Sequence, residues 1–486
     1  MQSASLRIWL GALLVLCCAF ITSATSPTNS ISKTTIPIPT HFQNIKVLRI
    51  IDLRTPIVHE DIGFRAKNIG NQPVNEYYLT FKAQDEENIA SINAFLRQGP
   101  KTALSIEQAG FDSEKELQLY KVTFDSPLQP DEEIRFGVKV AYTNVIEPLP
   151  KKLPQISRQH LIFNGNVYLF SPYNTEEIKT TLQLPNEKIL SYTGNDEIVV
   201  KTGNKIIYGP FQNIPAESYN ILSCHYEYLK PVLTLTSLRR DFQLSHWGGN
   251  LAVEEHFALR HDGAKMEEPF NRAKYQLSRS VHAQTNVLQH LPLELPAHAR
   301  DIYYRDDIGN VSTSALTYGP SATILDIKPR YPLYGGWNYT WFHGYNIDLG
   351  YFARYSKKSG VYILNFKFVE NVIDMAVEKV EVNVILPEGA KNVKVNAPFK
   401  LDSIEHTKHF TNFDTTGHYK VVLKKFNVIN EHSQPIQITY EYSSIRYLQK
   451  PLAASVGFFA LFIFSIIISK LPVVIGQQKK SLLKEE

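Results

Sequence analysis

One uncharged apolar run near the C-terminus constrains this chain more than any other feature of its sequence. The run covers Pro451–Ser469. As a helix it is about 28 Å long, close to the thickness of the hydrocarbon core of a bilayer. A helix in a protein core would carry a polar stripe, but the polar side chains of this run are three serines. We therefore predict a transmembrane helix at 450–470, followed by a short tail at 471–486.

The N-terminus has the pattern of a secretory signal peptide, which we predict at 1–24. Arg7 provides a positive start, Ile8–Ile21 is apolar, and Thr22-Ser23-Ala24 offers small residues for cleavage. An uncleaved anchor is the alternative. With the signal removed, the body lies in the lumen and the lysine-bearing tail in the cytosol. This single-pass type I orientation fits the positive-inside rule.

Charge and cysteine content narrow the class of protein further. The net charge of +4 arises from Arg7 and from the lysine-rich segment 450–486, so the body is neutral and would not attract nucleic acid. Cys224 is the one cysteine left once the predicted signal is removed. The body then has no internal disulfide and depends on its hydrophobic cores for stability. We expect Cys224 to be a buried apolar side chain rather than a nucleophile.

The body of the chain has a hydrophobic period of two. Apolar and polar residues alternate cleanly in four segments, which is typical of half-buried antiparallel strands. The apolar positions are Ile134, Phe136, Val138, Val140 and Tyr142; Leu364, Phe366 and Phe368; Val380, Val382, Val384 and Leu386; and Ile436, Ile438, Tyr440 and Tyr442. Helical patterns are weaker, with one short helix expected in Ile89–Arg97 and part of another in Pro269–His290. The predicted fold class is mainly β.

A change of pattern around Tyr228–Pro231 suggests a domain boundary. Each side of it opens with strands near an arginine-rich stretch and closes with an alternating strand followed by proline. We expect two similar lumenal β-rich domains of sandwich or saddle-like shape, at 25–230 and 231–449, followed by the one transmembrane helix.

Two small residues in the predicted helix, Ala453 and Gly457, are four positions apart. This spacing lets a second helix approach closely, so the pair is a candidate helix-packing face. Small residues are common in such helices, and chance is the competing explanation.

The search for reactive groups returns weak candidates. The best candidate for a set of zinc ligands is Glu254-Glu255-His256 together with His261. In a strand, however, alternate side chains point to opposite faces, which separates Glu254 and His256 from the other two. Asp306-Asp307 is expected to be a solvated turn rather than a metal pair. Arg239-Arg240 is expected to be a strand-edge charge rather than an anion site. No catalytic, cofactor or metal site is predicted.

Two N-x-[ST] triplets fall in the predicted lumenal body. They begin at Asn310 and Asn338, and neither has proline at its centre, so both are predicted N-glycosylation acceptors. Around the second, Tyr334–Trp341 is rich in aromatic residues. This segment either caps the sheet locally, which we favour, or forms a contact surface.

Several longer motifs occur in a fixed order along the body: Tyr208-Gly209-Pro210-Phe211, Ser245-His246-Trp247-Gly248, Tyr303–Thr313, Pro329–Trp337 and Leu386–Asn392. In these motifs the chain resembles the ribophorin I family, whose members are subunits of the endoplasmic reticulum oligosaccharyltransferase. The resemblance runs from about Phe42 through the apolar helix and is strongest over Tyr208–Asn392. The short tail of the chain resembles the fungal form of the family.

The resemblance implies a non-catalytic subunit in the endoplasmic reticulum membrane. Its complex transfers a preassembled oligosaccharide from dolichyl diphosphate to asparagine in N-x-S/T of nascent proteins, with the active site on a separate polytopic subunit. Implied partners are that catalytic subunit, other membrane subunits, nascent polypeptide and the translocon, and no cofactor is implied. Two other classes stay open: a single-pass surface receptor or adhesion glycoprotein, and a membrane-anchored hydrolase.

Overall fold

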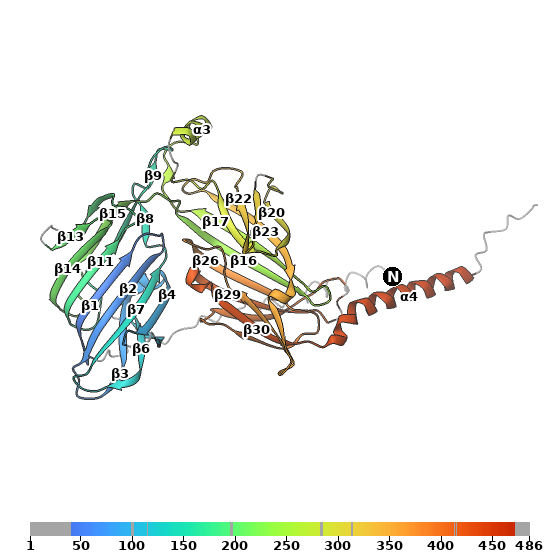
Figure 1. Cartoon of the computed structure of the whole chain (residues 1–486), viewed down its shortest axis with the longest axis horizontal. Coiled ribbons are helices and arrows are strands. Elements are labelled where there is room, and N and C mark those ends of the chain that lie inside the picture. Colours follow the sequence, from blue (N-terminus) through green and yellow to red (C-terminus); the bar gives the residue numbers. More distant parts are fainter. Residues whose placement is uncertain are drawn as a thin grey trace, which may run out of the picture.

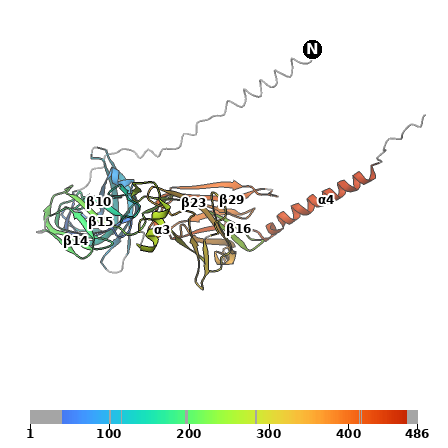
Figure 2. The same ribbon diagram turned by 90° about the horizontal axis from the view of Figure 1, so that it is seen from above.

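The computed structural model describes residues 40–98, 102–113, 115–194, 198–281, 285–312, 314–412, 414 and 416–471. The predicted signal peptide and residues 472–486 of the predicted tail lie outside this range. Two β-rich halves lie side by side, and helix α4 (Gln449–Lys470) projects from the second half (Figure 1). The view from above shows the same arrangement (Figure 2).

The first half contains a ten-stranded and a four-stranded sheet. Their strand orders are β13-β14-β11-β1-β2-β7-β4-β5-β6-β3 and β12-β15-β10-β8. The bounds are β1 (Phe42–Asp52), β2 (Val58–Asn68), β3 (Val74–Lys82), α2 (Ala83–Glu86), β4 (Ile89–Leu96), β5 (Ala103–Asp112), β6 (Leu117–Leu128), β7 (Glu133–Tyr142), β8 (Ile146–Pro148), β9 (Lys152–Leu153), β10 (His160–Asn166), β11 (Thr175–Gln183), β12 (Ile189–Tyr192), β13 (Val199–Thr202), β14 (Lys205–Ile214) and β15 (Ile221–Glu227).

The second half contains a seven-stranded sheet, a four-stranded sheet and a three-stranded sheet. Their orders are β20-β23-β17-β16-β26-β29-β28, β24-β25-β30-β27 and β19-β22-β21, while β9 pairs with β18 across the halves. The bounds are β16 (Leu233–Ser245), β17 (Asn250–His261), β18 (Lys265–Met266), α3 (Arg272–Val281), β19 (Leu291–Pro296), β20 (Arg300–Asp306), β21 (Ala315–Tyr318), β22 (Ala322–Ile327), β23 (Asn338–Asp348), η1 (Leu349–Tyr351), β24 (Ala353–Ser356), β25 (Val361–Lys367), β26 (Ala376–Ile385), β27 (Lys391–Asn396), β28 (Ser403–His409), β29 (His418–Val428), η2 (Asn430–His432), β30 (Pro435–Glu441) and η3 (Ser444–Leu448).

The two halves repeat one strand order. The run β13-β14-β11-β1-β2-β7-β4 of the first half corresponds to β28-β29-β26-β16-β17-β23-β20 of the second. In each run a single parallel pair, β1–β11 or β16–β26, stands among antiparallel neighbours. The small sheets correspond as well, since β12-β15-β10-β8 matches β27-β30-β25-β24.

Each half also places a buried arginine–glutamate pair at corresponding positions of this framework. In the first half, Arg49 on β1 donates to both carboxylate oxygens of Glu60 on β2, at 3.2 and 2.5 Å. Arg49 also donates to the carbonyls of Asn166 and Tyr168, at the end of β10 in the small sheet. The pair therefore joins the large sheet to the small one.

Arg240 on β16 makes the equivalent contacts in the second half. It donates to Glu255 on β17 at 2.5 Å and to the carbonyls of Lys367 and Phe368 at the end of β25. Burial disfavours the charged form of Glu255, but the charge and hydrogen bond of Arg240 and the contact with His343 together outweigh it and lower the pKa of Glu255 to about 2. Arg240 is 1% exposed, on an inner strand. The expectation of a strand-edge charge is therefore wrong for Arg240.

The alternating segments are confirmed as strands with one buried face. The predicted apolar positions of β7, β25, β26 and β30 are buried, except for the partly exposed Tyr142 and Tyr442. The short helix expected in Ile89–Arg97 is wrong, because β4 occupies this segment and pairs with β7. Ala90 and Ala94, four apart as on a helix face, are instead buried in a strand whose partner satisfies its backbone. The expected helix within Pro269–His290 is present as α3.

The hydrophobic cores change membership close to the proposed domain boundary. Val232 belongs to a cluster of first-half residues, and Leu233 begins the large second-half cluster. We keep the division 25–230 and 231–449 as a proposal, which this change supports. Between the halves, a small buried cluster contains Ile57 and Ile429, and His59 pairs with Glu431 at 2.7 Å.

Replacing Arg240 should destabilise the second half severely. Arg240→Ala removes the positive charge that pairs with Glu255 and leaves this carboxylate buried. We expect the free energy of unfolding to fall by about 3–5 kcal/mol. Arg239→Ala is the matched control. Its side chain is 48% exposed and pairs with Asp241 at the surface, so its loss should cost about 1 kcal/mol or less. Denaturant unfolding of both full-length variants in detergent measures the difference, and equal losses would contradict the structural role of Arg240.

Candidate functional site

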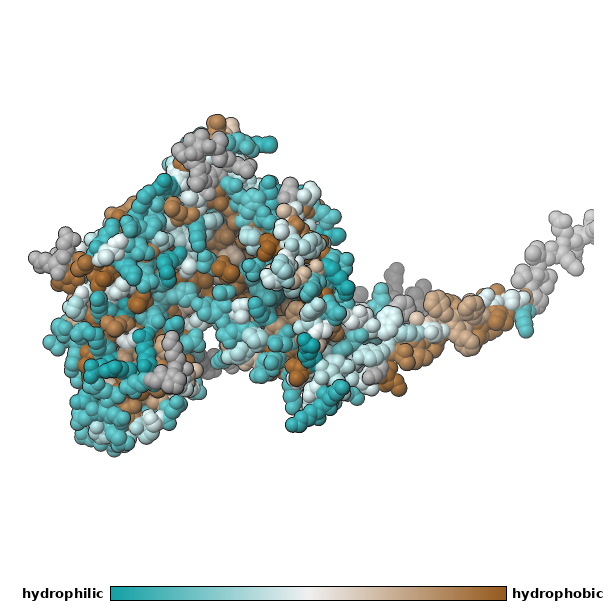
Figure 3. All heavy atoms as spheres, in the orientation of Figure 1, coloured by the Kyte–Doolittle hydropathy of each residue, from teal (hydrophilic) through white to brown (hydrophobic). Residues whose placement is uncertain are grey.

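Helix α4 is long and apolar enough to cross a membrane. The continuous helical segment Ile445–Lys470 has 26 residues, and its apolar window is unburied. The space-filling view shows its hydrophobic surface extending away from the mostly hydrophilic β halves (Figure 3). The predicted C-terminal membrane-spanning helix is therefore present, and Lys470 lies at its far end as expected.

The first turn of α4 is fastened to the second half by an ion pair between a half-exposed lysine and a buried aspartate. Lys450 contacts Asp414 at 2.7 Å and also donates to the hydroxyl of Thr411. The side chain of Asp414 is 1% exposed and lies in the connection between β28 and β29. Burial disfavours its ionisation, but the contacts with Lys450 and Thr411 prevail and lower the pKa of Asp414 to about 2. The helix thus leaves the β body in a fixed direction.

Five aromatic rings pack together just before α4, where one of them lies in η3, and we call them the helix-base cluster: His246, Tyr362, Tyr440, Tyr442 and Tyr447. His246 stacks on Tyr442 with ring centroids 4.9 Å apart and meets Tyr362 edge-on at 4.4 Å. The hydroxyls of Tyr362 and Tyr447 lie 3.2 Å apart. Burial lowers the pKa of His246 to about 4, so the ring is neutral and packs as an aromatic side chain.

Sequence reasoning placed the notable aromatic cluster elsewhere, at Tyr334–Trp341. There Trp341 stacks on Phe257 inside the core, and Trp337 packs against Tyr334 and Phe270. These contacts fit the local cap that the sequence favoured. The helix-base cluster was missed because its rings come from segments far apart in the chain. The one local signal was the motif containing His246.

The candidate packing face on α4 meets no other described part of the chain. Nothing lies within 4 Å of a side chain built at Gly457, and Ala453 is only partly buried. Its pairing with another helix stays a prediction.

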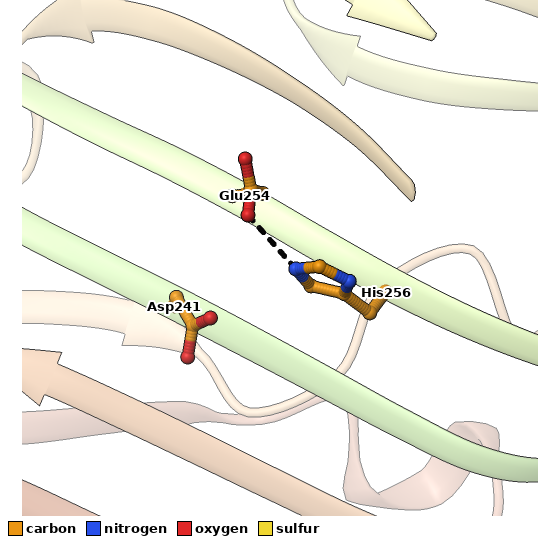
Figure 4. Close-up of side chains that lie close together, drawn as sticks. All are labelled: Asp241, Glu254 and His256. Atoms are coloured by element: carbon orange, nitrogen blue, oxygen red, sulfur yellow. Dashed lines mark hydrogen bonds and ion pairs between the residues drawn. The ribbon is translucent and has the colours of Figure 1, made fainter. Parts of the chain in front are cut away.

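Three side chains capable of binding a metal meet on the exposed face of β16 and β17. Figure 4 shows Glu254 and His256 on one strand and Asp241 on the other. Their ligand atoms all lie within 4.8 Å of one another. As expected, Glu255 and His261 lie on the opposite face, where both are buried. Asp241 was not foreseen because it comes from the neighbouring strand.

This cluster already contains its counter-charge. Arg239 donates to Asp241 at 3.1 Å and contacts the Nε2 atom of His256 at 2.8 Å, which is also the atom nearest Glu254. Tyr303 donates its hydroxyl to the second oxygen of Glu254. A metal ion would have to displace the guanidinium, so these residues fit an ion-pair network better than a zinc site.

The other sequence candidates are also structural. Asp306 is buried and accepts bonds from Arg330, so the expectation of a solvated turn is wrong at that position. Cys224 is buried as expected, and burial raises the pKa of its thiol to about 12, which makes it a poor nucleophile.

Both predicted glycan acceptors lie on the surface. Asn310 and Asn338 are exposed, as are the hydroxyl residues Ser312 and Thr340 of their triplets. The hydroxyl of Thr340 donates to Asp307. This exposure supports glycosylation, which stays a prediction for both.

These features define a class: within the described residues, a β-rich body joined to one helix that is long and apolar enough to cross a membrane. Comparison of sequences gives the family. The family described as Ribophorin I matches residues 42–469, and the chain belongs to it.

Named relatives and solved structures add detail. Dolichyl-diphosphooligosaccharide–protein glycosyltransferase subunit 1 of Caenorhabditis elegans is 36% identical over 430 residues, covering 88% of this chain and 72% of that protein. Subunit 1B of Arabidopsis thaliana is 32% identical, covering 87% and 92%. Native yeast LTA4 hydrolase superposes with a TM-score of 0.27 at 10% identity, covering 44% of this chain and 34% of that one. A likeness this low carries no argument for a hydrolase.

Loss of the acceptors should change the mass of the protein in steps. Asn310→Gln and Asn338→Gln should each remove one glycan, and the double variant should match wild-type protein digested with an endoglycosidase. Asn346→Gln, on the same strand as Asn338 but outside any triplet, is the control and should leave the mass unchanged. Gel mobility measures each step. A wild-type protein insensitive to the endoglycosidase would contradict both assignments.

Proposed function

We propose that this chain is a non-catalytic accessory subunit of the oligosaccharyltransferase of the endoplasmic reticulum membrane. The supporting observation is the family match over 42–469, which spans both β halves and α4. Relatives of known name are subunits of a dolichyl-diphosphooligosaccharide–protein glycosyltransferase. The complex moves an oligosaccharide from dolichyl diphosphate to asparagine in N-x-S/T of nascent proteins.

The chemistry of the described residues supports the absence of a catalytic role. The cluster of Asp241, Glu254 and His256 is neutralised by Arg239, and the thiol of Cys224 is buried. A single helix cannot enclose a polyprenyl chain within a bilayer, so the lipid-linked donor must bind elsewhere. The active site therefore lies on a separate polytopic subunit.

The chain acts as a scaffold whose body lies in the lumen and whose tail lies in the cytosol. Helix α4 offers Ala453 and Gly457 to a helix of a neighbouring subunit. The ion pair between Lys450 and Asp414 connects α4 to the β body, so a partner bound to the helix is also held in place relative to the body. The two lumenal domains hold the catalytic subunit and present nascent polypeptide to it near the translocon. A surface receptor would share this topology, and no observation favours it.

Depletion of the protein should cause underglycosylation of client proteins while the dolichol-linked donor is maintained or accumulates. Pulse labelling of glycoproteins measures the first, and extraction of lipid-linked oligosaccharide measures the second. Re-expression of the full chain is the control and should restore glycan occupancy. A collapse of the donor pool would instead place the protein in donor synthesis.

A further inference from the structure

The turn that joins β16 to β17 holds an exposed tryptophan in a fixed position. Trp247 is 76% exposed and lies in the turn 246–249 of the hairpin. The amide of Gly248 bonds to the hydroxyl of Ser245, and the amide of Leu349 bonds to the carbonyl of Gly249. Neighbouring His246 packs into the helix-base cluster. The tryptophan is therefore held outward by a supported turn.

This turn lies level with the point where α4 begins. Trp247 and Pro451, the first residue of the uncharged run, line the same small cavity of about 160 Å³, together with Lys450. Figures 1 and 2 both show the hairpin of β16 and β17 reaching the base of α4. If Pro451 marks the start of the hydrocarbon core, Trp247 lies in the headgroup layer.

Two further apolar side chains are exposed at the same level. Ile445 and Leu448, in η3 just before α4, are 76% and 55% exposed. Single exposed apolar residues are ordinary on a protein surface, but these three flank a membrane span. The tip of the hairpin, Ser245–Asn250, carries no charged residue that would resist contact with lipid.

We propose that Trp247, together with Ile445 and Leu448, inserts into the lumenal headgroup layer of the bilayer that α4 spans. The inference rests on the membrane span and lumenal orientation of the proposed function. Tryptophan prefers this layer because its ring is apolar and its N–H can bond to headgroups or water. The second half is thereby held to the membrane at two places, the helix and the hairpin. A membrane-spanning helix can itself tilt in the bilayer, so the junction with α4 does not set the tilt of the body relative to the membrane, and the second attachment fixes it.

Quenching of tryptophan fluorescence by brominated lipid tests this contact. The mature chain, from which the predicted signal peptide and its Trp9 have been removed, is reconstituted in phosphatidylcholine nanodiscs, with and without bromine on the upper acyl chain. Trp337 and Trp341 serve as internal controls because both lie far from the hairpin tip. Trp341 pairs with Phe257, and Trp337 directly precedes Asn338, which pairs with Arg260 near the opposite end of β17. Trp247→Phe isolates the contribution of Trp247. Its exposed position predicts an unchanged melting temperature.

Brominated lipid should reduce the emission of the wild type and leave that of Trp247→Phe unchanged. Equal quenching in both proteins would overturn the proposal. A second result would also overturn the proposal. In it, aqueous iodide quenches Trp247 in nanodiscs, and Trp247 becomes shielded only in the assembled complex. That result would assign the surface to a protein partner. Either outcome would leave the depletion experiment unaffected.

Discussion

The fastening of α4 to the second β half determines what this chain can do at a membrane. Lys450 pairs with the buried Asp414, and the helix-base cluster packs at η3 just before α4, so two sets of contacts hold the junction. A helix joined through a flexible linker would tether the body without orienting it. Here a displacement of the helix by a neighbouring subunit must move the β body with it. That rigidity suits a protein that positions others.

The β body has its own internal repetition. Both halves use one strand order, and in both a buried arginine bridges the large and small sheets. Arg49 and Arg240 each satisfy backbone carbonyls that would otherwise be unpaired where the two sheets meet. Such a pair disfavours a slipped register, because the slip would leave a buried charge without a partner. These two buried pairs thus help to maintain the shape of each half.

Sequence patterns identified the elements whose signal is local. The uncharged run before Lys470 specified α4, and period-two alternation identified strands such as β7 and β26. Features that depend on pairing between distant strands could not be read in this way. The sequence predicted Arg240 to be a strand-edge charge, whereas β16 lies between two other strands of its sheet. Asp241 lies beside Glu254 and His256 because of the β16–β17 register, which the sequence alone does not give. Ala90 and Ala94 have the spacing of a helix face but lie in strand β4.

The central claim is that this chain contributes position and not chemistry to glycan transfer. The most direct test replaces Asp241, Glu254 and His256 together by Asn, Gln and Asn, which keeps the shapes of the two carboxylates, leaves a smaller polar group in place of the imidazole, and removes their charge and proton-transfer capacity. Transfer of oligosaccharide to an acceptor peptide by the purified complex is then measured. We expect the rate of the wild-type complex. Loss of transfer in a complex that retains all its subunits would contradict the account.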